Sequence, residues 1–220
     1  MIKSMIRKFR SYTVFTAVTV FCMTGCQRSS AQTIQPALQD DTLSEDGLLS
    51  LTDYRLCSQK METGGKTVCV ELWLDEGVYG SGEAFGWGGG IYEENFDGTY
   101  RLLVRDQEGT ILSERDLGRQ NFSGEFEILV EDYNQDACPD FTIGAFASSS
   151  TNSYTMYTLW ENAEIGVIGE ELLKCGSDFS TVFQRGEGTA FYGSIWNNAI
   201  GEEEQILYEW DAEQKIYKNT

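Results

Sequence analysis

The chain has no histidine, only 2 prolines and few basic residues: 16 lysines and arginines stand against 35 aspartates and glutamates in 220 residues. Without an imidazole, Ser-His-Asp and Cys-His nucleophilic systems and histidine-ligated zinc or haem are excluded. A formal charge of −19 argues against binding to the phosphate backbone of nucleic acid, which needs clustered lysine and arginine. Carboxylate, hydroxyl, thiol or lysine chemistry is left, or binding without chemistry.

Long hydrophobic runs are also lacking. The apolar segment near the N-terminus, Thr13–Met23, is about half as long as the ~20 residues that a helix needs to cross a bilayer. A basic region precedes it, with Lys3, Arg7, Lys8 and Arg10. A positively charged region followed by a short apolar one is typical of a signal peptide.

The residues that end this segment, Met23-Thr24-Gly25-Cys26, resemble the bacterial lipobox. The resemblance implies a lipoprotein signal peptide over residues 1–25, cleavage before Cys26, and a diacylglycerol and palmitate anchor on that cysteine. It also implies that a lipid bilayer is a partner and that the protein sits on the extracytoplasmic face of the cell membrane. The alternative is an ordinary secretory signal that is cut elsewhere, with Cys26 incidental.

The next residues, 26–47, are polar and contain Pro36 and several acidic side chains. This composition favours a flexible, disordered linker between the anchor and a folded domain over residues 48–220.

Four cysteines fall within the expected domain: Cys57, Cys69, Cys138 and Cys175. They form no CxxC pair and have no histidine partner, so a zinc site is disfavoured. Export permits disulfides, and four cysteines allow three pairings; four free, buried thiols are an equal alternative.

In this domain apolar residues alternate with polar ones, as in Thr67–Leu74. Similar segments are Tyr100–Arg105, Glu125–Val130, Phe141–Ala147, Tyr154–Trp160, Phe179–Gln184, Thr189–Trp196, Gln205–Trp210 and Lys215–Lys218. A period of two residues predicts β-strands, and only Gly169–Cys175 suggests one helical turn. Many short strands separated by turn residues predict an all-β domain.

A faint repeat runs through these strands. An aromatic strand, a polar turn and a return strand begin at Tyr100, at Tyr157 and at Tyr208, roughly 50 residues apart. Such a period fits a four-stranded blade. We therefore expect an antiparallel meander of blade-like units, arranged as a partial propeller or in a β-sandwich-like manner.

One motif has the spacing of a metal loop. Oxygen-bearing side chains occur at Asp132, Asn134, Asp136 and Asp140, and Cys138 can offer its backbone carbonyl. Alternate residues of a tightly wound loop point inward, and Ca²⁺ prefers six to eight oxygen ligands. Ala137 stands where such loops usually have glycine, at a cost of about 1 kcal/mol if the positive φ is kept.

Together with the flanking strands, this motif resembles an FG-GAP/VCBS-type β-propeller blade, a unit also found in integrin α-subunits. The resemblance covers Gly124–Ile165 and implies one structural Ca²⁺ held by Asp132, Asn134, Asp136, Cys138 and Asp140. The chain has one such loop, whereas a full propeller repeats it. The alternative is an Asp/Asn-rich turn whose side chains bond to their own backbone.

A second candidate is the glycine-rich segment Gly80–Tyr92, which carries Phe85, Trp87 and Tyr92. Aromatic side chains on such a loop could stack on sugars or on a peptide, or could fold back on the sheet.

We therefore expect a membrane-anchored, extracytoplasmic lipoprotein that acts as a binding or scaffolding module for an envelope protein or a glycan. An envelope enzyme that acts on carbohydrate or uses a carboxylate pair in a cleft is the alternative. No catalytic residue is singled out.

Overall fold

The computed structural model describes residues 47–81, 94–124, 126–148, 150–176 and 178–220. These residues form twelve strands and are all-β, as the alternation predicts. The strands are β1 (Leu49–Thr63), β2 (Lys66–Gly80), β3 (Asn95–Arg105), β4 (Ile111–Ser123), β5 (Val130–Glu131), β6 (Asp140–Phe146), β7 (Thr151–Leu159), β8 (Ile165–Cys175), β9 (Gln184–Arg185), β10 (Phe191–Asn197), β11 (Glu202–Asp211) and β12 (Ile216–Asn219).

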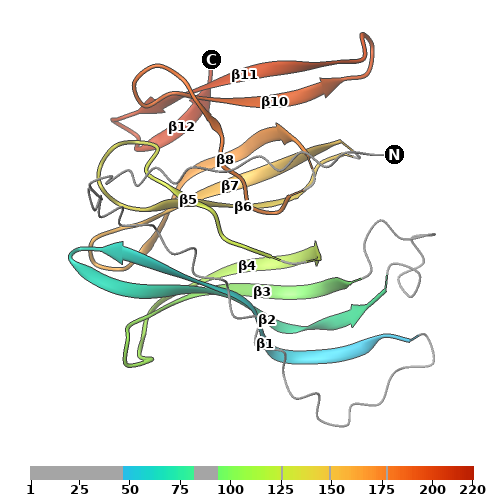
Figure 1. Cartoon of the computed structure of the whole chain (residues 1–220), viewed down its shortest axis with the longest axis vertical. Coiled ribbons are helices and arrows are strands. Elements are labelled where there is room, and N and C mark those ends of the chain that lie inside the picture. The colour runs from blue at the N-terminus through green and yellow to red at the C-terminus, as the bar shows by residue number, and fades with distance from the viewer. Residues whose placement is uncertain (1–46, 82–93, 125, 149, 177) are drawn as a thin grey trace, which may run out of the picture. The chain divides into compact units, whose positions relative to one another are not determined.

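The strands form three antiparallel sheets of four, none of them closed into a barrel, and each follows chain order from edge to edge. We call them the first sheet (β1–β4), the middle sheet (β5–β8) and the third sheet (β9–β12). Figure 1 shows the middle sheet between the other two. The expected antiparallel meander of blade-like units is confirmed.

The repeat seen in the sequence has a structural counterpart. Tyr100, Tyr157 and Tyr208 lie in β3, β7 and β11, the third strand of each sheet. All three side chains are buried. A polar turn then leads to the fourth strand, so each aromatic hairpin is the outer half of one meander.

Three expected elements are wrong in detail. The suggested helical turn over Gly169–Cys175 is part of β8. Glu171 has a φ of 53°, and the register shifts on either side of Met156, so the alternation breaks and Ile168, Gly169 and Leu172 are all buried. That burial spacing imitates a helix.

The described residues of the expected strands Glu125–Val130 and Phe179–Gln184 are mostly irregular. Only Val130 and Gln184 lie in strands. Phe126, Ile128 and Phe179 are nevertheless buried in the core, which explains the apolar signal. The amide of Leu129 donates to Ser180 Oγ at 3.0 Å, so a side chain replaces the strand partner.

The middle sheet is buried on both faces. Phe141, Ile143, Tyr157 and Leu159 pack with the first sheet in one apolar core. Other side chains of the middle sheet, among them Tyr154, Met156, Ile168 and Leu172, pack with the third sheet in a second core. Residues of β7 alternate between the two cores, because successive side chains of a strand point to opposite faces.

The four described cysteines are free thiols. Across the β1–β2 hairpin Cys69 faces Lys60, so this register brings no bridge between Cys57 and Cys69. Burial raises the pKa of Cys57 to about 12, which keeps its thiol protonated. Within the described ranges no helix is long and apolar enough to span a bilayer.

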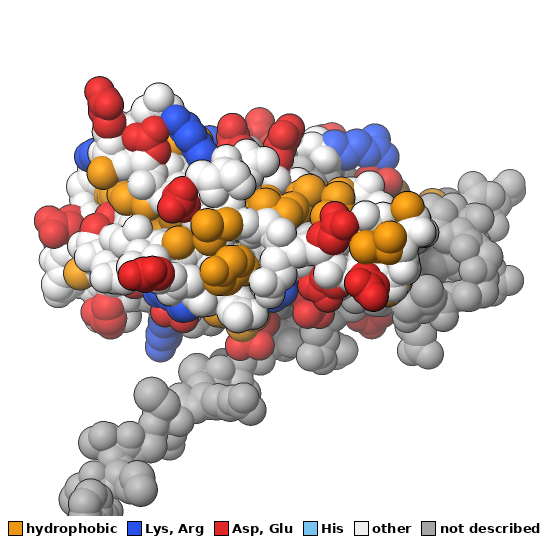
Figure 2. Space-filling model, turned by 90° about the horizontal axis from the view of Figure 1, so that it is seen from above, with side chains coloured by type: hydrophobic (Ala, Val, Ile, Leu, Met, Phe, Trp, Pro, Cys, Tyr) orange, Lys and Arg blue, Asp and Glu red, His pale blue; other side chains and the backbone are white. Residues whose placement is uncertain are grey.

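Acidic side chains predominate over basic ones on the face shown in Figure 2, with apolar side chains between them. In the third sheet Trp196 is 40% exposed and Ile200, in the turn after β10, is 60% exposed. The excess of acidic side chains on this face agrees with the strongly negative formal charge of the sequence.

The middle and third sheets approach each other closely at Gly193. A Cβ at this position would lie 2.2 Å from the carbonyl oxygen of Leu173 and 2.7 Å from the ring of Tyr208. We predict that Gly193→Ala lowers the free energy of unfolding by about 1–3 kcal/mol, measured by urea denaturation, because the two sheets must separate. Gly186→Ala is the control, since its Cβ would meet nothing nearer than 3.3 Å. Equal stability of Gly193→Ala and the parent would contradict this packing.

Candidate metal centre

The loop that carries the candidate ligands connects β5 to β6 and is wound by its own side chains. The Asp132 carboxylate accepts hydrogen bonds from the amides of Asp136, at 3.2 Å, and Ala137, at 3.1 Å. Asp136 Oδ1 accepts from the amide of Cys138 at 2.8 Å. Ala137 has a φ of 66°, so the left-handed conformation expected at this position is kept without glycine.

Two residues that the sequence did not single out fasten this loop to the third sheet. Tyr133 is 1% exposed, lies in the second core and accepts a hydrogen bond from the amide of Phe183 at 2.6 Å. The Arg185 guanidinium lies over the Tyr133 ring, donates to the Tyr133 carbonyl at 2.8 Å and contacts the Asp132 carbonyl. It also pairs with Glu131 at 3.2 Å. Arg185 follows the loop by some fifty residues, so no local pattern could reveal it.

Asp140 is the most unusual residue of the loop. It is fully buried, and its Oδ2 accepts from the amide of Tyr133 at 2.8 Å. Its Oδ1 is buried without a hydrogen-bond partner among the described residues. Burial raises the pKa of Asp140 to about 7; the Tyr133 amide opposes this, and repulsion from Asp136 and Asp132 adds to it.

The chemistry of the donor atoms suits a hard cation. It offers carboxylate and amide oxygens, and the orphaned Oδ1 of Asp140 is an acceptor in need of a positive partner. Burial raises the pKa of the Cys138 thiol to about 11, so the thiol is protonated at neutral pH.

The same loop also satisfies the alternative expectation of a hydrogen-bonded turn. Asn134 Nδ2 donates to Asp136 Oδ2 at 2.9 Å, and the carboxylates of Asp132 and Asp136 bond to loop amides. Within the described ranges no three acidic or cysteine side chains converge as a metal cluster. The structure therefore brings the five predicted residues into one loop without gathering their side chains around one point.

The other predicted site residues lie outside the described ranges. They are the lipidation residue Cys26 and the aromatic residues Phe85, Trp87 and Tyr92.

The enzyme alternative needs two carboxylates in a cleft, one of them with a raised pKa. Among the described carboxyl groups, burial raises the pKa values of Asp75 and Asp140. Asp75 pairs with Arg101 on the first sheet, and Asp140 is buried between the middle and third sheets. These two acids are not a pair.

Comparisons of the chain with models of protein families, with curated proteins and with solved structures found no match.

Replacing the buried carboxyl group of Asp140 should show how much its ionisation lowers the free energy of unfolding. Because the pKa of Asp140 in the folded protein, about 7, lies above the ~4 of an unfolded aspartate, the folded state loses stability as pH rises between these values. We predict that in EDTA Asp140→Asn is more stable than the parent at pH 8, by up to about 4 kcal/mol, and that the difference shrinks towards pH 4. Urea unfolding across this pH range measures it. A variant that is less stable than the parent at pH 8 would contradict the prediction.

Proposed function

We propose that the chain is a lipid-anchored lipoprotein on the extracytoplasmic face of a cell membrane, where it acts as a binding or scaffolding module. The anchor is supported by the order of a basic region, a short apolar segment and Met23-Thr24-Gly25-Cys26. A binding role is supported by one feature of the first sheet. The face that is turned away from the middle sheet is polar and carries two hollows of about 440 and 460 Å³.

The FG-GAP/VCBS-like loop would hold one structural Ca²⁺. Asp132, Asn134, Asp136 and Asp140 would bind it through side chains, and Cys138 through its carbonyl. A bound cation supplies the positive charge that the buried Asp140 lacks and offsets repulsion among the carboxylates. Tyr133 and Arg185 join this loop to the third sheet, so an ion here would strengthen the boundary between two sheets.

A calcium titration by calorimetry, on residues 27–220 purified in EDTA, tests the loop. We expect saturable binding by the parent and none by Asp132→Ala. Ca²⁺ at a hundred times Kd should add about 2.7 kcal/mol of stability to the parent alone. Asp178→Ala is the matched control, because Asp178 is exposed and lies outside the loop. If millimolar Ca²⁺ produces neither heat nor a shift in melting temperature, the loop is a turn and the calcium proposal fails.

The lipid anchor has its own test, which does not depend on calcium. In a bacterial host fed an alkyne analogue of palmitate, the parent should carry the label and remain with the membrane fraction. Cys26→Ser should lose the label and leave that fraction, whereas Cys22→Ser, within the apolar segment, should behave as the parent. A labelled Cys26→Ser protein would refute the assignment.

A further inference from the structure

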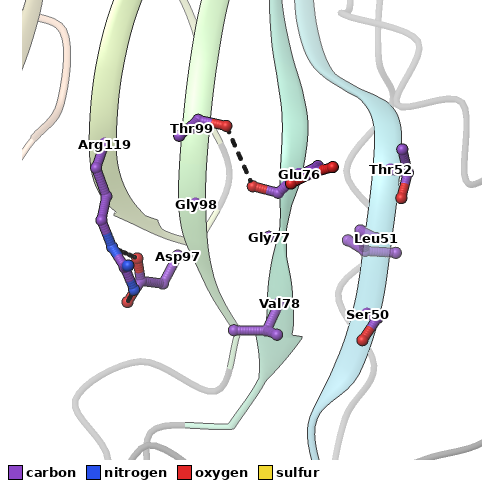
Figure 3. Close-up of a pocket in the computed structure, with 10 residues that line it drawn as sticks. All are labelled: Ser50, Leu51, Thr52, Glu76, Gly77, Val78, Asp97, Gly98, Thr99 and Arg119. Carbon is purple, nitrogen blue, oxygen red and sulfur yellow. Dashed lines mark hydrogen bonds and ion pairs between the residues drawn. The ribbon is translucent and has the colours of Figure 1, made fainter.

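We propose that one hollow of the first sheet is a saccharide site, which takes a short, neutral, polyhydroxylated ligand. The inference deepens the proposed binding role and rests on it. This outer hollow has a volume of about 440 Å³, within the usual range of small-molecule sites. All four strands of the sheet contribute to it, and Figure 3 shows the residues that line it: Ser50, Leu51, Thr52, Glu76, Gly77, Val78, Asp97, Gly98, Thr99 and Arg119.

Strand register places the polar members of the hollow side by side. Thr52 pairs with Glu76, Glu76 with Thr99, and Thr99 with Arg119. The next row on the same face is Ser50, Val78 and Asp97. These side chains point away from the core because they alternate with core residues.

The core side of the hollow is closed by a pair of glycines. Gly77 faces Gly98 across β2 and β3. A Cβ at either position would come within 2.7 Å of Leu74 Cδ1, a fully buried side chain. The two strands therefore rest directly on Leu74, and their backbone forms the floor of the hollow.

A line of strand irregularities crosses the sheet next to the hollow. Asp53 has a φ of 50°, the register between β2 and β3 shifts at Asp75, and Gly118 has a φ of 67° beside a second shift. Arg101 contacts both acids, pairing with Asp53 at 2.9 Å and with Asp75. Bulges bend strands and re-aim side chains, and here they coincide on three strands. Arg101 thus fastens the bend that borders the hollow.

The chemistry of the walls suits hydroxyl groups. Arg119 and Asp97 form a two-pronged pair, with Nε to Oδ1 at 3.0 Å and Nη2 to Oδ2 at 3.2 Å. Such a pair presents donors and acceptors side by side, as adjacent sugar hydroxyls require. In Figure 3 the Glu76 side chain points away from Asp97, towards β1, so the two carboxylates can contact separate hydroxyls. The hydroxyls of Ser50, Thr52 and Thr99 add further donors and acceptors.

Charge selects a neutral ligand over an ionic one. An anion would be repelled by a chain of formal charge −19, and the one guanidinium in the hollow is already paired with Asp97. A cation would be attracted by the many acidic groups on the face shown in Figure 2, without preference for this place. An extended peptide would add to a free strand edge, which in the first sheet is β1 or β4, whereas the floor of the hollow is formed by β2 and β3, which are paired on both sides.

A binding assay on an array of short neutral oligosaccharides tests the proposal. The array carries oligosaccharides of glucose, galactose, mannose or N-acetylglucosamine, and the mature protein is extracted from membranes in detergent. We expect at least one of these saccharides to bind. Glu76→Gln and Arg119→Met should each weaken that binding by about tenfold or more. Both changes spare the fold, because Glu76 is exposed and the Arg119 side chain is 75% exposed. Lys218→Met, which breaks another surface ion pair at 2.7 Å, is the matched control and should bind as the parent.

Three results would overturn the saccharide site. They are the absence of binding to any sugar of the array, binding that survives both hollow variants, and binding of pentalysine that the hollow variants abolish. These failures differ from failure of the proposed function. A protein that binds no sugar but keeps its lipid label is still an anchored module, whereas loss of the anchor refutes that module whatever the array shows.

Discussion

Burial of the middle sheet on both faces is the constraint on which the rest of the described structure depends. β7 alternates between two apolar cores, with Tyr157 and Leu159 facing the first sheet and Tyr154 and Met156 facing the third. A strand in this position can hold a polar group only if that group finds a partner. Asp140 and Thr158 pair across β6 and β7, and each keeps one buried oxygen without a hydrogen bond. The candidate loop therefore ends where the packing tolerates a polar group least.

The loop between β5 and β6 holds several carboxyl groups close together, and these groups need donors or a positive charge. Its backbone amides already bond to Asp132 and Asp136, which is sufficient to shape a turn. The two carboxyl oxygens of the buried Asp140 receive one hydrogen bond, from the amide of Tyr133. The pKa of Asp140 is raised, which reflects the lack of donors for its charged form. A proton or a divalent cation would each relieve it, and a proton is available only below about pH 7. A bound calcium ion would relieve it above that pH, where the Asp140 carboxyl group is ionised.

On the outer face of the first sheet, side chains are held by ion pairs rather than by apolar contacts. Five of the seven ion pairs within the described residues lie there. Exposed pairs contribute little to stability, so their role here is to hold side chains in place. The exception is Glu71, which is 4% exposed and accepts hydrogen bonds from Arg55, Arg105 and Trp73. Burial alone would raise the pKa of Glu71, but these three donors lower it below its ordinary value. Such a fixed polar surface favours recognition of a polar ligand.

The sequence by itself determined the all-β class and the three aromatic hairpins, because each depends on neighbours within a few residues. Tertiary structure alone decided the rest. Bulges gave residues 168–172 a helix-like burial pattern, and Arg185 reached the loop from a distant strand. The outer hollow requires the register of four strands, which no single strand encodes. Alternation reports which residues of a strand are buried, whereas pairing and layering depend on the packing of segments far apart in the chain.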